Sequence, residues 1–95
     1  MSKSIMQEEK SCYACGLTIG LHRHHIFYGT SNRKQSEKYG CWVYLCPYHH
    51  TLSNHAVHVD RAFDLRLKEE CQSVLIENGW SEEEFIKTFG KNYLS

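Results

Sequence analysis

The sequence lacks several features that would assign it to a broad class at once. Its longest apolar run, residues 41–46, is far shorter than the ~20 residues that cross a bilayer, so we expect no membrane span. No apolar signal segment precedes Cys12 and the cysteine count is odd, which argues against a secreted disulfide scaffold and for a soluble, intracellular, cytoplasmic protein. The net charge is zero, so no overall basic field indicates a nucleic-acid partner.

Repeats, linkers and low-complexity tracts are also absent, and we expect the 95 residues to form one domain. A chain of this length buries a modest share of its surface. Residues 1–10 are polar and charged, predict a flexible or loosely docked arm, and leave even less material for a core. A structural metal ion would compensate, because zinc supplies folding free energy on the order of 10 kcal/mol in small zinc peptides.

Cysteine and histidine occur in two pairs with the spacing of metal ligands. The pairs are Cys12-x-x-Cys15 and Cys46-x-x-His49. A gap of two residues lets both donors of a turn reach one tetrahedral zinc ion at ~2.0–2.3 Å. These four residues therefore predict a structural Zn²⁺ site, and this spacing is the strongest signal in the chain.

Between and around these pairs the sequence predicts two strands and a helix. Residues 22–28 and 41–46 are rich in β-formers, and the polar segment 32–39 predicts a short helical turn that ends at Gly40. Pro47 suits the first turn of a helix that carries His49, His50 and Asn54. Residues 11–58 are thus expected to form a zinc knuckle, a hairpin and a helix.

The C-terminal part, residues 59–95, is expected to be helical. Apolar residues recur every three or four positions from a possible N-cap at Asp60 to a stop at Asn78-Gly79. Cys71 lies within that stripe and is interpreted as a small core residue. Ser81-x-x-Glu84 predicts a capping box that opens a last helix, which Gly90 closes. The expected fold class is α+β.

The doublets His24-His25 and His49-His50 predict a second site. Consecutive strand residues point to opposite faces, so His24 and His25 should serve different purposes. On a helix, His50 lies about 100° beyond His49 and should face a centre other than the zinc. His24 and His50 could together hold a divalent ion with open positions, and His25 could act as general base toward a water molecule.

The remaining histidines leave alternatives open. His58 could return toward this ion as a third ligand or a phosphate contact, or it could lie on the surface. Asn54 could be a further ligand, one helical turn beyond His50. We interpret His22 as a strand residue on the side of His24, and His55 as facing solvent.

Basic residues gather near the first doublet, and only Glu37 opposes them there. Such side chains contact backbone phosphates and confer affinity without sequence choice, although ordinary solvated lysines would give the same pattern. The candidates for contact with nucleic acid are Arg23, Asn32, Arg33, Lys34 and Lys38.

Together these motifs resemble the HNH endonuclease family, whose site is a ββα-metal finger of two strands and a helix around one catalytic ion. The resemblance covers residues 12–58 and rests on Cys12-x-x-Cys15, His24-His25 and Leu45-Cys-Pro-Tyr-His-His50. The wider pattern is similar to small HNH proteins of phages and prophages. It includes Asn32-Arg33, Ser36-Glu37 and the ending Phe-Gly-Lys-Asn-Tyr-Leu.

The resemblance implies metal-dependent hydrolysis of DNA. It implies that His24 and His50 bind a catalytic ion such as Mg²⁺, Mn²⁺, Ni²⁺ or Zn²⁺, and that His25 is the general base. The middle Asn of the family's motif falls on Cys41; in the family this Asn helps to orient the base through its backbone carbonyl, a task that another residue's carbonyl could perform.

Two other functions remain open at this point. One is a zinc-stabilised nucleic-acid-binding module without turnover, and the other is a structural zinc domain that makes protein contacts through its acidic C-terminal helices. The oligomeric state cannot be read from the sequence.

Overall fold

The computed structural model describes residues 3–94 and has an α+β fold built on a two-stranded antiparallel sheet. Strand β1 (His22–His25) pairs with β2 (Trp42–Leu45), and His24 lies opposite Val43 while His25 lies opposite Trp42. Both strands are shorter than the segments expected. β1 ends early because the backbone N–H and C=O of Phe27 bond to the Ser36 hydroxyl instead of to a strand.

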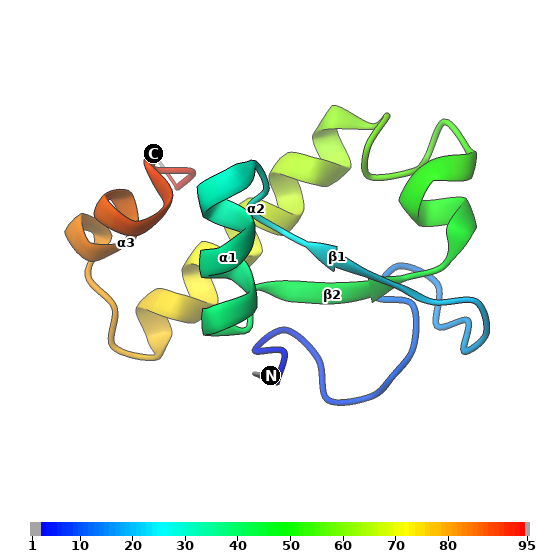
Figure 1. Ribbon diagram of the computed structural model, residues 1–95, viewed down its shortest axis with the longest axis horizontal. Coiled ribbons are helices and arrows are strands. Elements are labelled where there is room, and N and C mark those ends of the chain that lie inside the picture. Colours follow the sequence, from blue (N-terminus) through cyan, green and yellow to red (C-terminus); the bar gives the residue numbers. More distant parts are fainter. Residues whose placement is uncertain (1–2, 95) are drawn as a thin grey trace.

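Helix α1 (Thr30–Tyr39) connects the two strands and is longer than the helical turn predicted there. It ends at Gly40 as predicted, and Gly40 has a left-handed φ of 75°, which glycine adopts without strain. Figure 1 shows α1 at one end of the strands and the segment after β2 at the other end.

A single π-type turn, η1 (Tyr48–Leu52), follows β2. The backbone N–H groups of His49 and His50 both bond to the carbonyl of Cys46, so the turn begins directly after β2. The helix expected here stops at Leu52, so Asn54 lies outside it and the predicted helical spacing between His50 and Asn54 is wrong.

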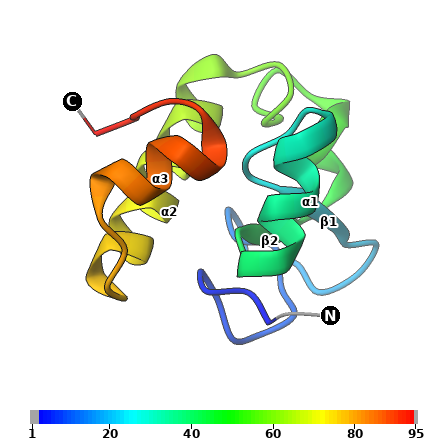
Figure 2. The ribbon, with the colours of Figure 1, turned by 60° about the vertical axis from the view of Figure 1, so that its left-hand side comes forward.

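Two helices form the C-terminal part, as predicted. Helix α2 (Arg61–Glu77) begins at the N-cap Asp60, whose carboxylate accepts from the N–H groups of Ala62 and Phe63. Helix α3 (Glu82–Phe89) begins with the capping box of Ser81 and Glu84. Figures 1 and 2 show α3 folded back beside α2, on the side of the molecule away from η1.

The core lies between the sheet and the two C-terminal helices. Cys71 of α2 is fully buried within it, in agreement with its interpretation as a core residue. Aromatic rings from three parts of the chain meet there, and the ring of Phe27 lies 4.4 Å from that of Phe89 and 5.2 Å from that of Phe85. This packing fixes the end of β1, where the histidine doublet lies.

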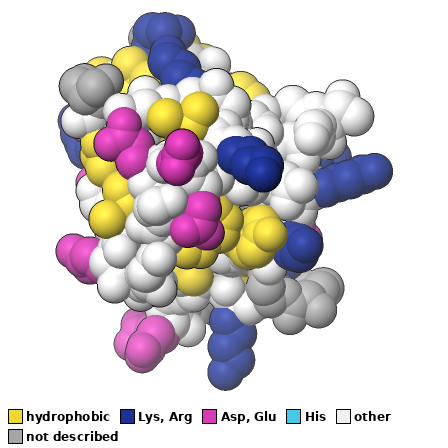
Figure 3. Space-filling model, turned by 90° about the vertical axis from the view of Figure 1, so that its left-hand side faces the viewer, with side chains coloured by type: hydrophobic (Ala, Val, Ile, Leu, Met, Phe, Trp, Pro, Cys, Tyr) yellow, Lys and Arg dark blue, Asp and Glu magenta, His cyan; other side chains and the backbone are white. Residues whose placement is uncertain are grey.

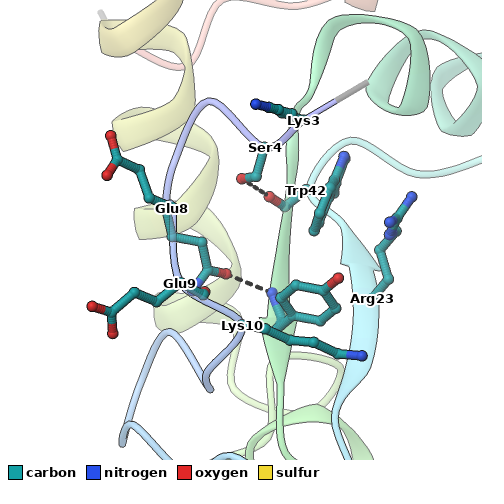
Figure 4. Close-up of a pocket in the computed structure, with 9 residues that line it drawn as sticks. Lys3, Ser4, Glu8, Glu9, Lys10, Arg23 and Trp42 are labelled. Atoms are coloured by element: carbon teal, nitrogen blue, oxygen red, sulfur yellow. Dashed lines mark hydrogen bonds between the residues drawn. The ribbon is translucent and has the colours of Figure 1, made fainter. Parts of the chain in front are cut away.

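The part of the N-terminal arm that the structure describes is docked along the free edge of β2. The Ser4 hydroxyl donates to the carbonyl of Trp42 over 2.5 Å, and the side-chain oxygen of Gln7 accepts from the N–H of Tyr44 over 2.7 Å (Figure 4). The N–H of Ile5 bonds to the carbonyl of Gly40. Covering an exposed strand edge in this way prevents pairing with other chains.

Within residues 3–94 the structure has no helix that is both long enough and apolar enough to cross a membrane.

Candidate metal centres

The four predicted zinc ligands converge on one point. Cys15 Sγ lies 3.8 Å from Cys46 Sγ, and His49 Nδ1 lies 3.3 Å from Cys46 Sγ and 3.8 Å from Cys12 Sγ. Two thiolates on a tetrahedral zinc ion lie roughly 3.8 Å apart, and a thiolate and an imidazole nitrogen roughly 3.6 Å apart. The observed spacings therefore fit a Cys₃His site, and this cluster could hold a metal ion such as zinc.

Local backbone bonds shape this first cluster. The N–H of Gly16 bonds to the carbonyl of Cys12, and Gly16 adopts a φ of 81°, so residues 12–16 form a turn that contains both cysteines. The N–H of Tyr13 bonds to the carbonyl of Tyr44, which docks the turn beside the end of β2. Although burial opposes it, backbone N–H groups directed at the sulfur lower the pKa of Cys12, which favours the thiolate that binds zinc.

A second cluster consists of three histidines, His24, His50 and His58, whose ligand atoms all lie within 4.8 Å of one another. His24 comes from β1, His50 from η1, and His58 from the turn before α2. The Nε2 atoms of His50 and His58 are 3.1 Å apart, and the ring centroids of His24 and His58 are 5.1 Å apart. The expected meeting of His24 and His50 is therefore present, and His58 joins them.

The burial and the protonation of His24 indicate that this cluster fits a metal ion. Its side chain is almost fully buried, and its Nε2 is without a hydrogen-bond partner among the described residues. Burial, reinforced by His58 and His50, lowers the pKa of His24 to about 3, so the ring is neutral and its lone pair is available. A buried polar atom without a partner costs free energy, and a bound ion would remove that cost.

The ligand set also indicates which ions fit. Imidazole ligands suit zinc, nickel and other first-row transition metals, whereas Mg²⁺ strongly prefers oxygen ligands. Of the ions that the sequence suggested, the transition metals therefore fit these residues better than Mg²⁺ does.

His22 is a further member of the site that sequence reasoning did not assign to it. Its Nδ1 lies 3.0 Å from the Nδ1 of His50, so it holds the His50 ring by the nitrogen that faces away from His58. Hydrogen bonds of this kind orient metal-ligating histidines. The signal was available in the alternation His22-x-His24, which places both rings on one face of β1.

His25 faces the opposite side of the sheet and lines an open groove of about 780 Å³. Strand β1 contributes Arg23 and His25 to this groove. Helix α1 contributes residues at the spacing i, i+3, i+4 and i+7, which form one stripe on its surface. These are Thr30, Arg33, Lys34 and Glu37.

Glu37 contacts both strand residues across the groove. Its Oε2 lies 2.8 Å from the Nε2 of His25, and its Oε1 lies 2.6 Å from Nη1 of Arg23. Although partial burial opposes it, the hydrogen bond from His25 and the charge of Arg23 lower the pKa of Glu37, so this carboxylate is ionised near neutral pH. Sequence reasoning noted its charge but gave it no role.

Three of the predicted site residues lie elsewhere. Asn32 donates from its amide to the carbonyl of Phe89, so it ties α1 to α3 instead of lining the groove. Lys38 lies over the ring of Tyr39 and is also outside the groove lining. Asn54 is exposed in the turn after η1. His55 is exposed, as expected.

The carbonyl of Cys41 accepts from the N–H of Ile26, and Cys41 itself is fully buried. The ring of His25 is instead bonded to Glu37. Among the hydrogen bonds of the described residues, the Cys41 carbonyl therefore contacts Ile26 and the His25 ring contacts Glu37.

Comparisons of the chain with protein-family models, with curated proteins and with solved structures found no match.

Proposed function

We propose that the protein is a metal-dependent endonuclease of the HNH type that hydrolyses phosphodiester bonds in DNA. One observation carries this proposal: three histidines converge on a single point, and the residue next to one of them, His25, lines an open groove with basic walls. In this proposal the two strands and η1 act as a ββα-metal finger. The Cys₃His cluster holds a structural zinc that fixes the finger.

The residues of the chain have separate roles in the proposed reaction. His24, His50 and His58 hold a divalent ion, which when bound supplies a positive charge that stabilises the phosphate and the departing oxygen. His25 takes a proton from a water molecule, the resulting hydroxide forms a bond to phosphorus, and the bond from phosphorus to the 3′ oxygen breaks. The departing oxygen then acquires a proton from solvent.

The charge of the groove supports a phosphate backbone as its occupant. Arg23, Arg33 and Lys34 are opposed in the lining only by Glu37, although the chain as a whole has no net charge. Contacts with phosphates through such side chains bring affinity and salt dependence without reading the base sequence. We therefore propose that Arg33 and Lys34 contact the DNA backbone beside His25.

A nucleic-acid-binding module without turnover is the second candidate, and the register of β1 favours it. His24 and His25 project from opposite faces of the sheet, so the ion and the base do not share one face. The third function, protein contacts through an acidic surface, finds less support. On the side of α3, Figure 3 shows acidic side chains scattered among basic and hydrophobic ones rather than gathered in one patch.

A plasmid assay separates the first two candidates. Purified protein loaded with Mn²⁺, Ni²⁺ or Zn²⁺ should nick supercoiled DNA, and His25→Ala should abolish nicking while binding to the same DNA persists. His55→Ala is the matched control, because His55 is an exposed histidine outside both clusters. If wild type binds DNA but no metal supports cleavage of duplex, single-stranded or branched forms, the module replaces the enzyme.

A further inference from the structure

Glu37 is the one acidic side chain among the described residues that line the groove, and it is turned toward the strand rather than toward the positive residues of its own helix. Its two oxygens are used separately: Oε2 meets His25 and Oε1 meets Arg23. A carboxylate that bridges an imidazole and a guanidinium in this way restricts both rotation of the imidazole ring and the choice of which nitrogen carries its proton.

The backbone of α1 holds Glu37 firmly at this place. The preceding residue, Ser36, is fully buried and forms two hydrogen bonds with the backbone of Phe27, at 2.7 and 3.1 Å. Its carbonyl accepts from the N–H groups of Gly40 and Cys41. The helix is thereby fixed at the residue next to Glu37 and against the segment that follows His25.

Arg23 is held from its other side by the sheet. Its guanidinium lies 3.8 Å from the ring centroid of Trp42, and Trp42 is the strand partner of His25. Figure 4 shows the side chains of Arg23 and Trp42 next to each other, projecting from the two adjacent strands. A guanidinium that is stacked on an indole and paired with a carboxylate has little freedom left. Trp42 therefore contacts Arg23, Arg23 contacts Glu37, and Glu37 contacts His25.

We propose that Glu37, held in place by Arg23, is a positioning residue for His25. Glu37 accepts the N–H of Nε2, so the neutral ring carries its proton there and Nδ1 keeps its lone pair for the groove. The effect of Glu37 on catalysis rests on the proposed function, because a general base needs the free lone pair of Nδ1. The position of the proton on the His25 ring does not rest on the proposed function and can be measured without any substrate.

The first test is therefore spectroscopic. In ¹⁵N-labelled protein, at a pH where His25 is neutral, the two ring nitrogens have different chemical shifts that identify which one is protonated. We expect wild type to carry the proton on Nε2 and Glu37→Ala to show a mixture of the two forms. Glu37→Gln retains an oxygen acceptor, so it should keep most of the wild-type state. If Glu37→Ala does not fold, the position of the proton in wild type alone decides the test.

The second test is kinetic and uses the metal-loaded protein. Glu37→Ala should lower kcat about 10- to 100-fold, the usual range for a group that orients a functional side chain, with little change in KM. Glu37→Gln should recover part of the loss. Glu69→Ala is the control, because Glu69 is an exposed carboxylate on α2.

The outcomes separate the two proposals. The positioning role is overturned, whatever the activity, if wild type carries the His25 proton on Nδ1 or if folded Glu37→Ala keeps it on Nε2. If the proton position changes as expected but the protein cleaves no DNA, the positioning role is supported and the nuclease proposal is rejected.

Discussion

Replacing Cys12 by serine tests the proposed structural zinc site most directly. A domain of 95 residues has an unfolding free energy of about 5–14 kcal/mol, from ~0.05–0.15 kcal/mol per residue. Structural zinc sites contribute ~10–16 kcal/mol in small peptides, so one of four ligands accounts for roughly 3 kcal/mol even if the remaining three still bind the ion. Because Cys12 is buried, the site cannot recruit water easily in its place.

This loss should be large enough to read from thermal unfolding. In a domain of this size each kcal/mol shifts Tm by ~4–8 °C, so we expect Cys12→Ser to melt about 12–24 °C lower, or to fail to fold. The assay is calorimetry combined with metal analysis, which should find close to one tightly held zinc in wild type. Cys71→Ser is the control, because Cys71 is a buried thiol outside both clusters, and this substitution should lower Tm less and leave the zinc content unchanged. Equal, mild effects of the two substitutions, without bound zinc, would refute the argument.

The remaining predictions concern the histidine cluster. His58→Ala removes one of three candidate ligands and should weaken binding of a second metal ion by at least tenfold in a competition titration. The zinc content of the Cys₃His cluster should not change, and equal affinities would exclude His58 as a ligand. Burial, reinforced by His58 and His50, lowers the pKa of His24 to about 3 from 6.5, so between these values the unfolded chain binds a proton that the folded protein does not. In protein without the second ion, stability should therefore fall as the pH drops from about 6.5 toward 3, by a few kcal/mol in all. Urea unfolding of wild type and His24→Asn at each pH isolates this term, and parallel profiles would contradict it.

The C-terminal helices were predictable from sequence because their signals are local. Asp60 caps α2 through N–H groups two and three residues away, and Ser81 and Glu84 cap α3 within a single turn. The members of the Cys₃His cluster were predictable for a related reason, since each pair lies within one turn and only the meeting of the two pairs depends on the fold. Such signals operate over three or four residues, so the rest of the structure has little influence on them.

Helix α1 was underestimated because its stability is not local. It has no apolar periodicity, and its anchor is Ser36, a polar residue that is buried only because Phe27 offers both a donor and an acceptor. The contacts of Glu37 with His25 and of His22 with His50 were missed for the same reason, because they span 12 and 28 positions of the chain. Strand alternation placed His22 on the face of His24, but no local spacing rule shows which ring it meets there.

The alternation of strand side chains was the step of sequence reasoning that constrained the site most. It required the side chains of His24 and His25 to lie on different faces of the strand. In the structure the buried His24 belongs to the three-histidine cluster, and His25 lines an open groove. The same alternation limits how a nuclease could use them. His25, opposite Trp42, is the last paired residue of β1. Groups on the two faces of the sheet could therefore contact the same phosphate only if it lay around this end of the strand. Helix α1 begins close to that end, and its residues Arg33 and Lys34 lie in the same groove, so the positive charge lies where such a phosphate would have to enter.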